Sequence, residues 1–170
     1  KEKWSTKELQ TVQTDVKLWS AEMMKEASCK LLKSKSSSFT EIEQTAYEAL
    51  ENWDGIMEIS SIGTSVFMVT NYHVMKYMLQ QKLDVEFIKL YLNRIDHWDF
   101  LRNFLDHGAV PFEMQETPED ILYTGFKLAI NELSNKHGDM PNWKWGNLHH
   151  IEFEHPLGKQ KPLNSIFNVG

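Results

Sequence analysis

Cysteine, proline and glycine are scarce in most of this 170-residue chain. Cys29 is the single cysteine, so the chain holds no internal disulfide and is not a disulfide-stabilised scaffold. No proline occurs in the first 110 residues, where the only glycines are Gly55, Gly63 and Gly108. Because proline and glycine are the residues that most often interrupt helices, their scarcity predicts a helical region. All five prolines lie after residue 110, which predicts a less regular end.

Basic charge and long apolar runs are also scarce. The chain has 18 Lys and Arg against 24 Asp and Glu, a net charge of −6, which disfavours nucleic acid as a partner because phosphate binding needs a basic face. No window approaches the ~20 apolar residues that a membrane span requires. The hydrophobic content of 41% is that of an ordinary globular protein, so we expect one ordered domain.

Short helix-start patterns divide the chain into segments. Ser5 with Glu8 and Thr40 with Glu43 fit capping boxes, in which paired side chains satisfy backbone N–H groups of the first turn. Thr117 precedes a proline and two acidic residues, which is typical of a helix start. With the apolar spacing between them, such patterns predict helices over 6–33, 40–53, 60–81, 84–106 and 118–137, with breaks at Asp15 and near Asn93.

Apolar spacing also predicts which helix faces are buried. In the first segment an apolar face comprises Leu9, Val12, Val16, Trp19, Met23, Ala27 and Leu31. The segment 60–81 is rich in strand formers, but its apolar residues recur at helical spacing and it is too long for one strand. We therefore interpret 60–81 as a buried helix, with His73 as a hydrogen-bonded core histidine.

The end of the chain has a different periodicity. Residues 149–155 alternate with a period of two, which is typical of a strand, and Pro156 ends the pattern. The fold class that we expect is mainly α, a lobe of six or seven helices over residues 1–137. Residues 138–170 would follow with one C-terminal strand and an irregular tail. A single strand leaves backbone groups unpaired, so it needs a partner from another chain or segment.

Motifs for common reactions are missing. The sequence has no glycine-rich phosphate loop of either common type and no Gly-x-Ser-x-Gly elbow. Cys29 falls within a predicted helix with no histidine near it in sequence, so we interpret it as a small buried hydrophobe rather than a nucleophile. We assign no catalytic, cofactor-binding or metal-ligating residue.

Three groups of residues have both a functional and a structural interpretation. On the expected strand, His150, Glu152 and Glu154 share a face, but positions four residues apart are ~13 Å apart, which favours a polar strand edge over a metal site. Trp53, Trp143 and Trp145 are expected to be buried and to serve packing. Methionines at helical spacing favour core packing over a flexible groove; they are Met23, Met24, Met57, Met68, Met75 and Met78.

Three ordered motifs carry a resemblance to a known family. The most specific is Trp143-Lys144-Trp145-Gly146-Asn147-Leu148-His149, followed by His155-Pro156-Leu157-Gly158 and Phe167-Asn168-x-Gly170. Upstream lie Gln13-Thr14-Asp15 and Leu50-x-x-Trp53-Asp54-Gly55. In this order and spacing the motifs resemble the penicillin acylase (penicillin amidase) family of N-terminal nucleophile hydrolases, over about residues 7–170.

The resemblance implies an internal piece of the β subunit of such an enzyme, a helical lobe that decorates a four-layer αββα core. The parent enzyme would cleave linear amide C–N bonds of acylated substrates. Its nucleophile, at the β-subunit N-terminus, and its oxyanion-hole Asn would both precede the matched region, and no residue here matches either, since Lys1 stands first. The partners implied are the α subunit and the rest of the β subunit, in the periplasm or outside a bacterial cell. The lobe alone is expected to be inactive, without cofactor or metal.

Two other interpretations stay open at this point. In the first interpretation, the chain is a free-standing helical interaction module. Such a module requires an exposed apolar patch on its Met- and Trp-rich faces. Alternatively, it is a small metal-binding protein that uses residues 149–155.

Overall fold

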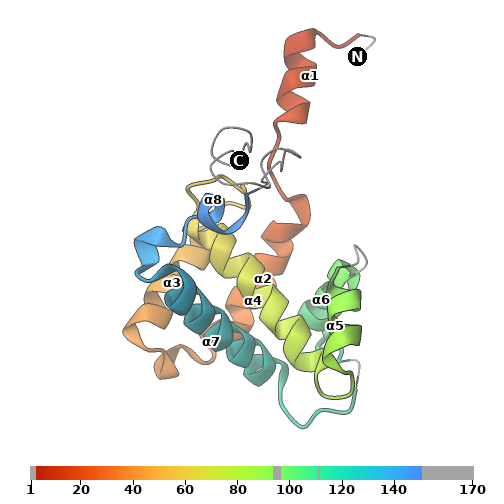
Figure 1. Ribbon diagram of the computed structural model, residues 1–170, viewed down its shortest axis with the longest axis vertical. Helices are drawn as coiled ribbons and strands as arrows, with labels where there is room; N and C mark the ends of the chain where they lie inside the picture. Colours follow the sequence, from red (N-terminus) through yellow and green to blue (C-terminus); the bar gives the residue numbers. More distant parts are fainter. Residues whose placement is uncertain (1–2, 94–96, 111, 151–170) are drawn as a thin grey trace, which may run out of the picture.

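A computed structural model describes residues 3–93, 97–110 and 112–150 (Figure 1). This part of the chain contains eight α-helices, and its only β pairing is an antiparallel bridge between Lys17 and Ile56. The mainly α fold class is therefore confirmed. The helices are α1 (Thr6–Gln13), α2 (Trp19–Lys33), α3 (Glu41–Glu51), α4 (Ile62–Leu79), α5 (Val85–Leu92), α6 (His97–His107), α7 (Pro118–His137) and α8 (Trp145–Leu148), with 3-10 turns at Ser36–Ser38 and Met140–Asn142.

The helix starts use the predicted caps. In the first capping box, the backbone N–H of Ser5 donates to the Glu8 carboxylate and the backbone N–H of Glu8 donates to the Ser5 hydroxyl. Thr40 and Glu43 make the same reciprocal pair at the start of α3. The Thr117 hydroxyl accepts a hydrogen bond from the first turn of α7. Because each cap satisfies backbone donors that the helix itself leaves unpaired, these residues fix where the helices begin.

The two longer predicted segments are interrupted as expected. The Asp15 carboxylate accepts a hydrogen bond from the backbone N–H of Lys17 at 2.9 Å, a local turn that competes with helix and separates α1 from α2. α5 and α6 are likewise separate helices. Residues 94–96 between them, and the expected strand beyond His150, lie outside the described residues. The sequence does not predict α8, because four residues are too few for a periodic signal.

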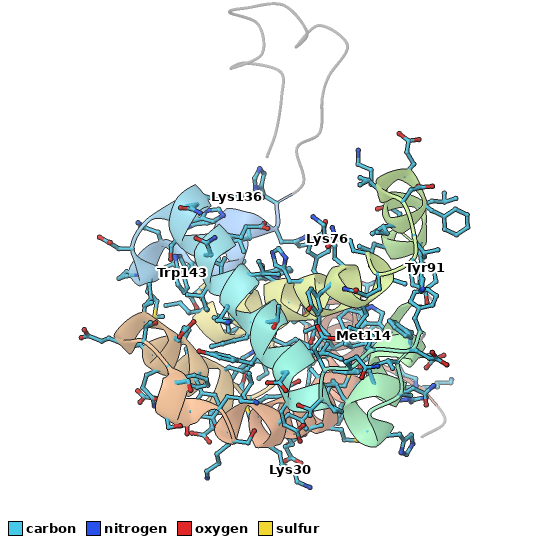
Figure 2. All side chains as sticks on the ribbon, turned by 90° about the horizontal axis from the view of Figure 1, so that it is seen from below. Lys30, Lys76, Tyr91, Met114, Lys136 and Trp143 are labelled. Carbon is cyan, nitrogen blue, oxygen red and sulfur yellow. The ribbon has the colours of Figure 1, made fainter. Side chains whose placement is uncertain are left out.

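α4 is the central helix, and α7 runs alongside it (Figures 1 and 2). A Cβ atom added to Gly125 of α7 would lie 2.4 Å from a methyl carbon of Val74 of α4, so the two backbones come together at a place where only glycine fits. The helical interpretation of 60–81 is confirmed, and α4 is buried on nearly every side. Its buried residues are Gly63, Thr64, Ser65, Val66, Phe67, Thr70, Asn71, His73, Val74, Met75, Met78 and Leu79.

The connection between α2 and α3 covers the start of α7. Phe39 lies in an aromatic cluster, with its ring centroid 5.7 Å from that of Tyr47, 5.5 Å from that of Tyr123 and 5.6 Å from that of Phe126. Aromatic rings at such separations gain stabilisation beyond the area they bury. The cluster therefore joins α3 and α7 into one core.

The apolar face predicted for residues 6–33 is only partly buried. Ala27 and Leu31 pack against the core, whereas the earlier positions are exposed, and α1 has no buried residue and projects from the other helices (Figure 1). The buried side of α2 consists instead of Ala21, Met24, Ser28, Cys29 and Leu32. We call the exposed set the N-terminal apolar face; it comprises Leu9, Val12, Val16, Trp19 and Met23.

The connection between α3 and α4, residues 52–61, joins distant parts of the chain by backbone hydrogen bonds. On one side the Leu18 N–H donates to the Gly55 carbonyl at 3.0 Å, and the Met57 N–H donates to the Val16 carbonyl at 3.0 Å. On the other side the N–H groups of Trp145 and Gly146 donate to the carbonyls of Ser61 at 3.0 Å and Ile59 at 2.8 Å. We call these residues the 52–61 loop.

Candidate functional site

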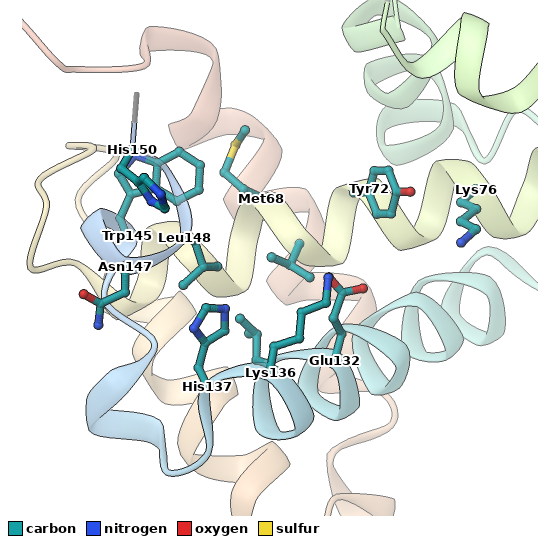
Figure 3. Close-up of a pocket in the computed structure, with 12 residues that line it drawn as sticks. Met68, Tyr72, Lys76, Glu132, Lys136, His137, Trp145, Asn147, Leu148 and His150 are labelled. Carbon is teal, nitrogen blue, oxygen red and sulfur yellow. The ribbon is translucent and has the colours of Figure 1, made fainter. Parts of the chain in front are cut away.

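A groove of about 730 Å³ lies between α4, α7 and the segment that contains α8 (Figure 3). This volume falls within the range of small-molecule sites, roughly 300–1,000 Å³. We call it the α4–α7 groove. α4 contributes Met68, Val69, Tyr72 and Lys76, α7 contributes Glu132, Leu133, Lys136 and His137, and the later segment contributes Trp145, Asn147, Leu148 and His150.

Two residues that line the groove, Glu132 and Lys136, are hydrogen-bonded in series with the buried His73 behind them. His73 Nε2 lies 2.8 Å from one oxygen of Glu132, and Lys136 Nζ donates to the other oxygen at 2.8 Å. His73 is buried, so the expectation of a hydrogen-bonded core histidine is confirmed. Both carboxylate oxygens of Glu132 are engaged, which fixes the position of this side chain between the two helices.

Burial and hydrogen bonding together determine the protonation states of His73 and Glu132. It lowers the pKa of His73, because removing the imidazolium from water costs more than the hydrogen bond to Glu132 returns. Burial on its own raises the pKa of Glu132, but the hydrogen bonds from Lys136 and His73 outweigh it and lower the pKa below its ordinary value. The stable form near neutral pH is therefore a neutral imidazole beside a carboxylate, and Lys136 neutralises that carboxylate.

Cys29 has none of the properties of a nucleophile. Burial, with a smaller contribution from the Glu51 carboxylate, raises the pKa of its thiol to about 11. The reactive thiolate is thus a minor form at neutral pH. The interpretation of Cys29 as a small core residue agrees with its place on the buried side of α2.

Most of the methionines and tryptophans serve packing, as predicted. Met24, Met75 and Met78 are buried and Met57 and Met68 pack against the core, whereas Met23 is exposed because it lies on the outer side of α2. Trp53 and Trp143 are buried. Trp145 is half-buried, and its ring stacks on His149 with centroids 4.8 Å apart.

The metal interpretation gains no support from the described residues. No group of three or more His, Cys, Asp or Glu side chains in residues 3–93, 97–110 and 112–150 is arranged to hold an ion. Of the expected face, His150 is described and lines the α4–α7 groove, whereas Glu152 and Glu154 lie beyond the described part. Within that part, no helix has the length and apolar character needed to cross a membrane.

Described residues of two sequence motifs, in 50–55 and 143–149, meet at the 52–61 loop. Gly55 has a φ of +81°, a left-handed backbone conformation that favours glycine, and the Asp54 carboxylate accepts the Ile56 N–H at 3.0 Å. A Cβ atom added to Gly146 would lie 3.0 Å from Cβ of Ile59, so glycine allows the close approach seen there. The described parts of these two motifs therefore form one structural unit.

A match to a known protein family extends over these motifs. Residues 1–170 match the family model described as penicillin amidase. The chain belongs to the penicillin amidase family. No curated protein sequence matches the chain. The family resemblance predicted from the sequence motifs is therefore confirmed.

Two motif tryptophans of this penicillin amidase family chain make packing and hydrogen-bond contacts in the described part. Trp53 Nε1 donates to the Ile56 carbonyl at 2.8 Å, and its ring lies against Phe67 with centroids 4.9 Å apart. Trp143 Nε1 donates to the Gly138 carbonyl at 2.9 Å. Lys25 Nζ donates to the Trp53 carbonyl at 2.7 Å. Sequence reasoning identified the motif residues but not these contacts, of which the Lys25 to Trp53 hydrogen bond joins α2 to a residue 28 positions later in the chain.

Proposed function

We propose that the chain is a structural helical lobe of the β subunit of a penicillin-amidase-type amidohydrolase. In this proposal residues 1–137 form the lobe and residues 138–170 return toward the catalytic core. The parent enzyme hydrolyses linear amide C–N bonds, with its nucleophile and oxyanion donors outside this chain. The partners of the lobe are the α subunit and the rest of the β subunit.

The N-terminal apolar face is the observation that carries the proposal. Trp19 is 72% exposed and Met23 65%, and α1 has no buried residue at all. An isolated helix shorter than about 12–15 residues is marginal in water, so the eight-residue α1 needs a surface to pack on. Contiguous exposed apolar residues of this kind mark a protein–protein contact. The rest of the parent enzyme is the partner that family membership suggests.

A lack of catalytic chemistry in the described residues is the second support. Acyl transfer needs an activated nucleophile, a base and oxyanion donors in one place. Cys29 is buried with a raised thiol pKa, and His73 is engaged with Glu132. Neither Cys29 nor the His73–Glu132 pair resembles a nucleophile hydrogen-bonded to a general base.

The decisive experiment tests binding to the remainder of the parent enzyme. The double variant Leu9→Ser/Val12→Ser should abolish co-purification of the chain with that remainder. The matched control, Lys7→Ser/Thr11→Ser, changes the opposite side of α1 and should leave co-purification intact. Equal retention of both variants would contradict a docking role for the N-terminal apolar face.

An activity measurement tests the assignment of chemistry. The chain alone should not hydrolyse phenylacetylated, long-chain acyl or homoserine-lactone amides, and hydrolysis should follow when the remainder of the parent is added. Saturable turnover by the chain alone that disappears on Cys29→Ala or His73→Gln would overturn the proposal.

A free-standing interaction module is the second candidate, because it also uses the exposed N-terminal apolar face. It predicts that the chain binds a partner unrelated to amidohydrolases, and that the Leu9→Ser/Val12→Ser variant no longer binds this partner. Competition by the parent remainder distinguishes the two candidates. Under the first proposal we also infer a bacterial periplasmic or secreted location, which detection of the parent enzyme in periplasmic extract or culture medium would test.

A further inference from the structure

The α4–α7 groove has a lysine at one end, and at the other the apolar Trp145 and Leu148 lie beside the polar His137, Asn147 and His150. Figure 3 shows Lys76 and Tyr72 at one end and Trp145, Leu148 and His150 at the other, with Lys136 and Glu132 between them. The groove is therefore long and amphipathic. Its volume of about 730 Å³ is ample for a molecule with an aromatic ring and a short chain.

The charge of the groove is not balanced by the protein. Among the described residues that line it, Glu132 is the one carboxylate, and its oxygens are already bound by His73 and Lys136. The Lys76 ammonium lies 5.8 Å from the centroid of the Tyr72 ring, and it forms no ion pair with a carboxylate in the described part. One positive charge thus remains at this end, on a chain whose net charge is −6.

The apolar end is built from side chains that the fold holds in place. Leu148 packs against the core, and Met68 and Val69 of α4 do the same. Trp145 is oriented by its stack on His149, with 13° between the ring planes, and by the hydrogen bond from its backbone N–H to Ser61. A preformed apolar wall of this kind favours a rigid, flat or branched hydrocarbon group.

We propose that the α4–α7 groove binds a small organic monocarboxylate with an apolar body. The ligand carboxylate lies next to the Lys76 ammonium. This positive charge is not neutralised by Glu132, whose oxygens are bound by His73 and Lys136. The apolar body lies along Leu133 and Leu148 toward Trp145. A single free cation matches a monoanion better than a doubly charged phosphate. The site lies apart from the N-terminal apolar face and does not depend on what covers that face.

Titration of the 170-residue chain with 4-phenylbutyrate tests this site. Binding is followed by calorimetry and by backbone amide shifts, which should move at Val69, Leu133 and Leu148. Two other ligands separate the contributions. 4-Phenylbutanamide has the same body without the charge, and butyrate has the charge without the body, and both should bind about tenfold or more weakly. Affinity of the amide equal to that of the acid, or no saturable binding of the acid, would overturn the proposal.

Two matched variants test the position of the anion. Lys76→Met keeps most of the side-chain length and should weaken 4-phenylbutyrate about tenfold, with little change for the amide. Lys82→Met, just beyond the end of α4 and exposed, should leave both affinities unchanged. Equal losses in the two variants would show non-specific attraction and overturn the assignment to Lys76. The Leu9→Ser/Val12→Ser variant should bind the acid normally, so failure of the docking proposal and failure of this site are distinguishable.

Discussion

α4 and α1 show how differently two helices of one chain are stabilised. α4 is surrounded by other helices, so that even small and polar residues such as Ser65, Thr70 and Asn71 are buried in it. α1 carries an apolar stripe and a complete capping box, yet buries nothing. Burial in this chain follows contact with neighbouring helices rather than apolar spacing alone. α4 is therefore stabilised by packing within the chain, whereas α1 has no such contacts to stabilise it.

Truncation in the α4–α7 core should have the largest effect. Phe126→Ala removes a fully buried ring that contacts Phe39, and such changes cost about 3–5 kcal/mol of the free energy of unfolding. Leu128→Ala, two residues on and 41% exposed, should cost less than about 1.5 kcal/mol. Urea unfolding followed by circular dichroism measures both. Similar losses would mean that α7 does not divide into a buried and an exposed side.

A backbone change in the 52–61 loop should have an intermediate effect. Gly55 has φ +81°, so Gly55→Ala forces a side chain into the left-handed region at a cost of roughly 1–2 kcal/mol. The space around it is sufficient, since the nearest atom to an added Cβ is 3.7 Å away, so strain and not collision is tested. Gly55→Asn is the control, because asparagine tolerates this conformation and should cost less. Thermal unfolding of the two variants measures this difference. If steric collision dominated instead of backbone strain, the larger Gly55→Asn variant would be the less stable of the two.

The His73 site should add a pH dependence to the stability of the core. Burial lowers the pKa of His73 in the folded chain, so the unfolded chain takes up its proton first as the pH falls. The stabilising contribution is complete above the ordinary histidine pKa of ~6.5 and is lost as pH falls through the folded value. Between pH 7 and 5 the free energy of unfolding should therefore fall more steeply in the wild-type chain than in His73→Gln.

An exposed histidine provides the control for that measurement. His107→Gln, at the end of α6, should keep the wild-type slope. A shallower slope in the wild type than in His73→Gln would mean that the attraction of Glu132 for the imidazolium exceeds the cost of burial.

Changes on α1 should have the smallest effect on the stability of the chain itself. Leu9→Ser/Val12→Ser alters side chains that touch no core residue, so the free energy of unfolding should change by less than about 0.5 kcal/mol. Denaturant unfolding checks this on the same variant used for co-purification. A loss of several kcal/mol would place α1 in the core and remove the contrast with α4.

The sequence predicted the helices well because their determinants are local. Capping side chains, the proline at Pro118 and apolar spacing act over three or four residues, and each boundary that they predicted in the described part is close to the observed one. The exposure of the N-terminal apolar face could not be predicted, because spacing gives the direction of a face but not what lies opposite it. The corrections concern Leu9, Val12, Val16, Trp19 and Met23, which apolar spacing placed on a buried face, and Trp145, which was expected to be buried and is half-buried.

The α4–α7 groove was beyond sequence reasoning for a similar reason. His73 was identified as a core histidine, but its partner Glu132 lies on another helix and belongs to no motif. Lys76, Lys136 and Trp145 likewise come from three separate segments. A site assembled by helix packing leaves no local pattern, whereas sequence motifs along the chain were enough to predict the penicillin amidase family.

The 52–61 loop has a consequence for the order of folding. Its hydrogen bonds join residues near the start of α2 to residues at α8, so they can form only after the chain has closed two long loops. Closing such loops costs chain entropy before the bonds return any stability, and contacts of this kind form late. We therefore expect the amides of Leu18, Met57 and Gly146 to exchange with solvent together, as one cooperative unit that opens before α4 and α7 separate.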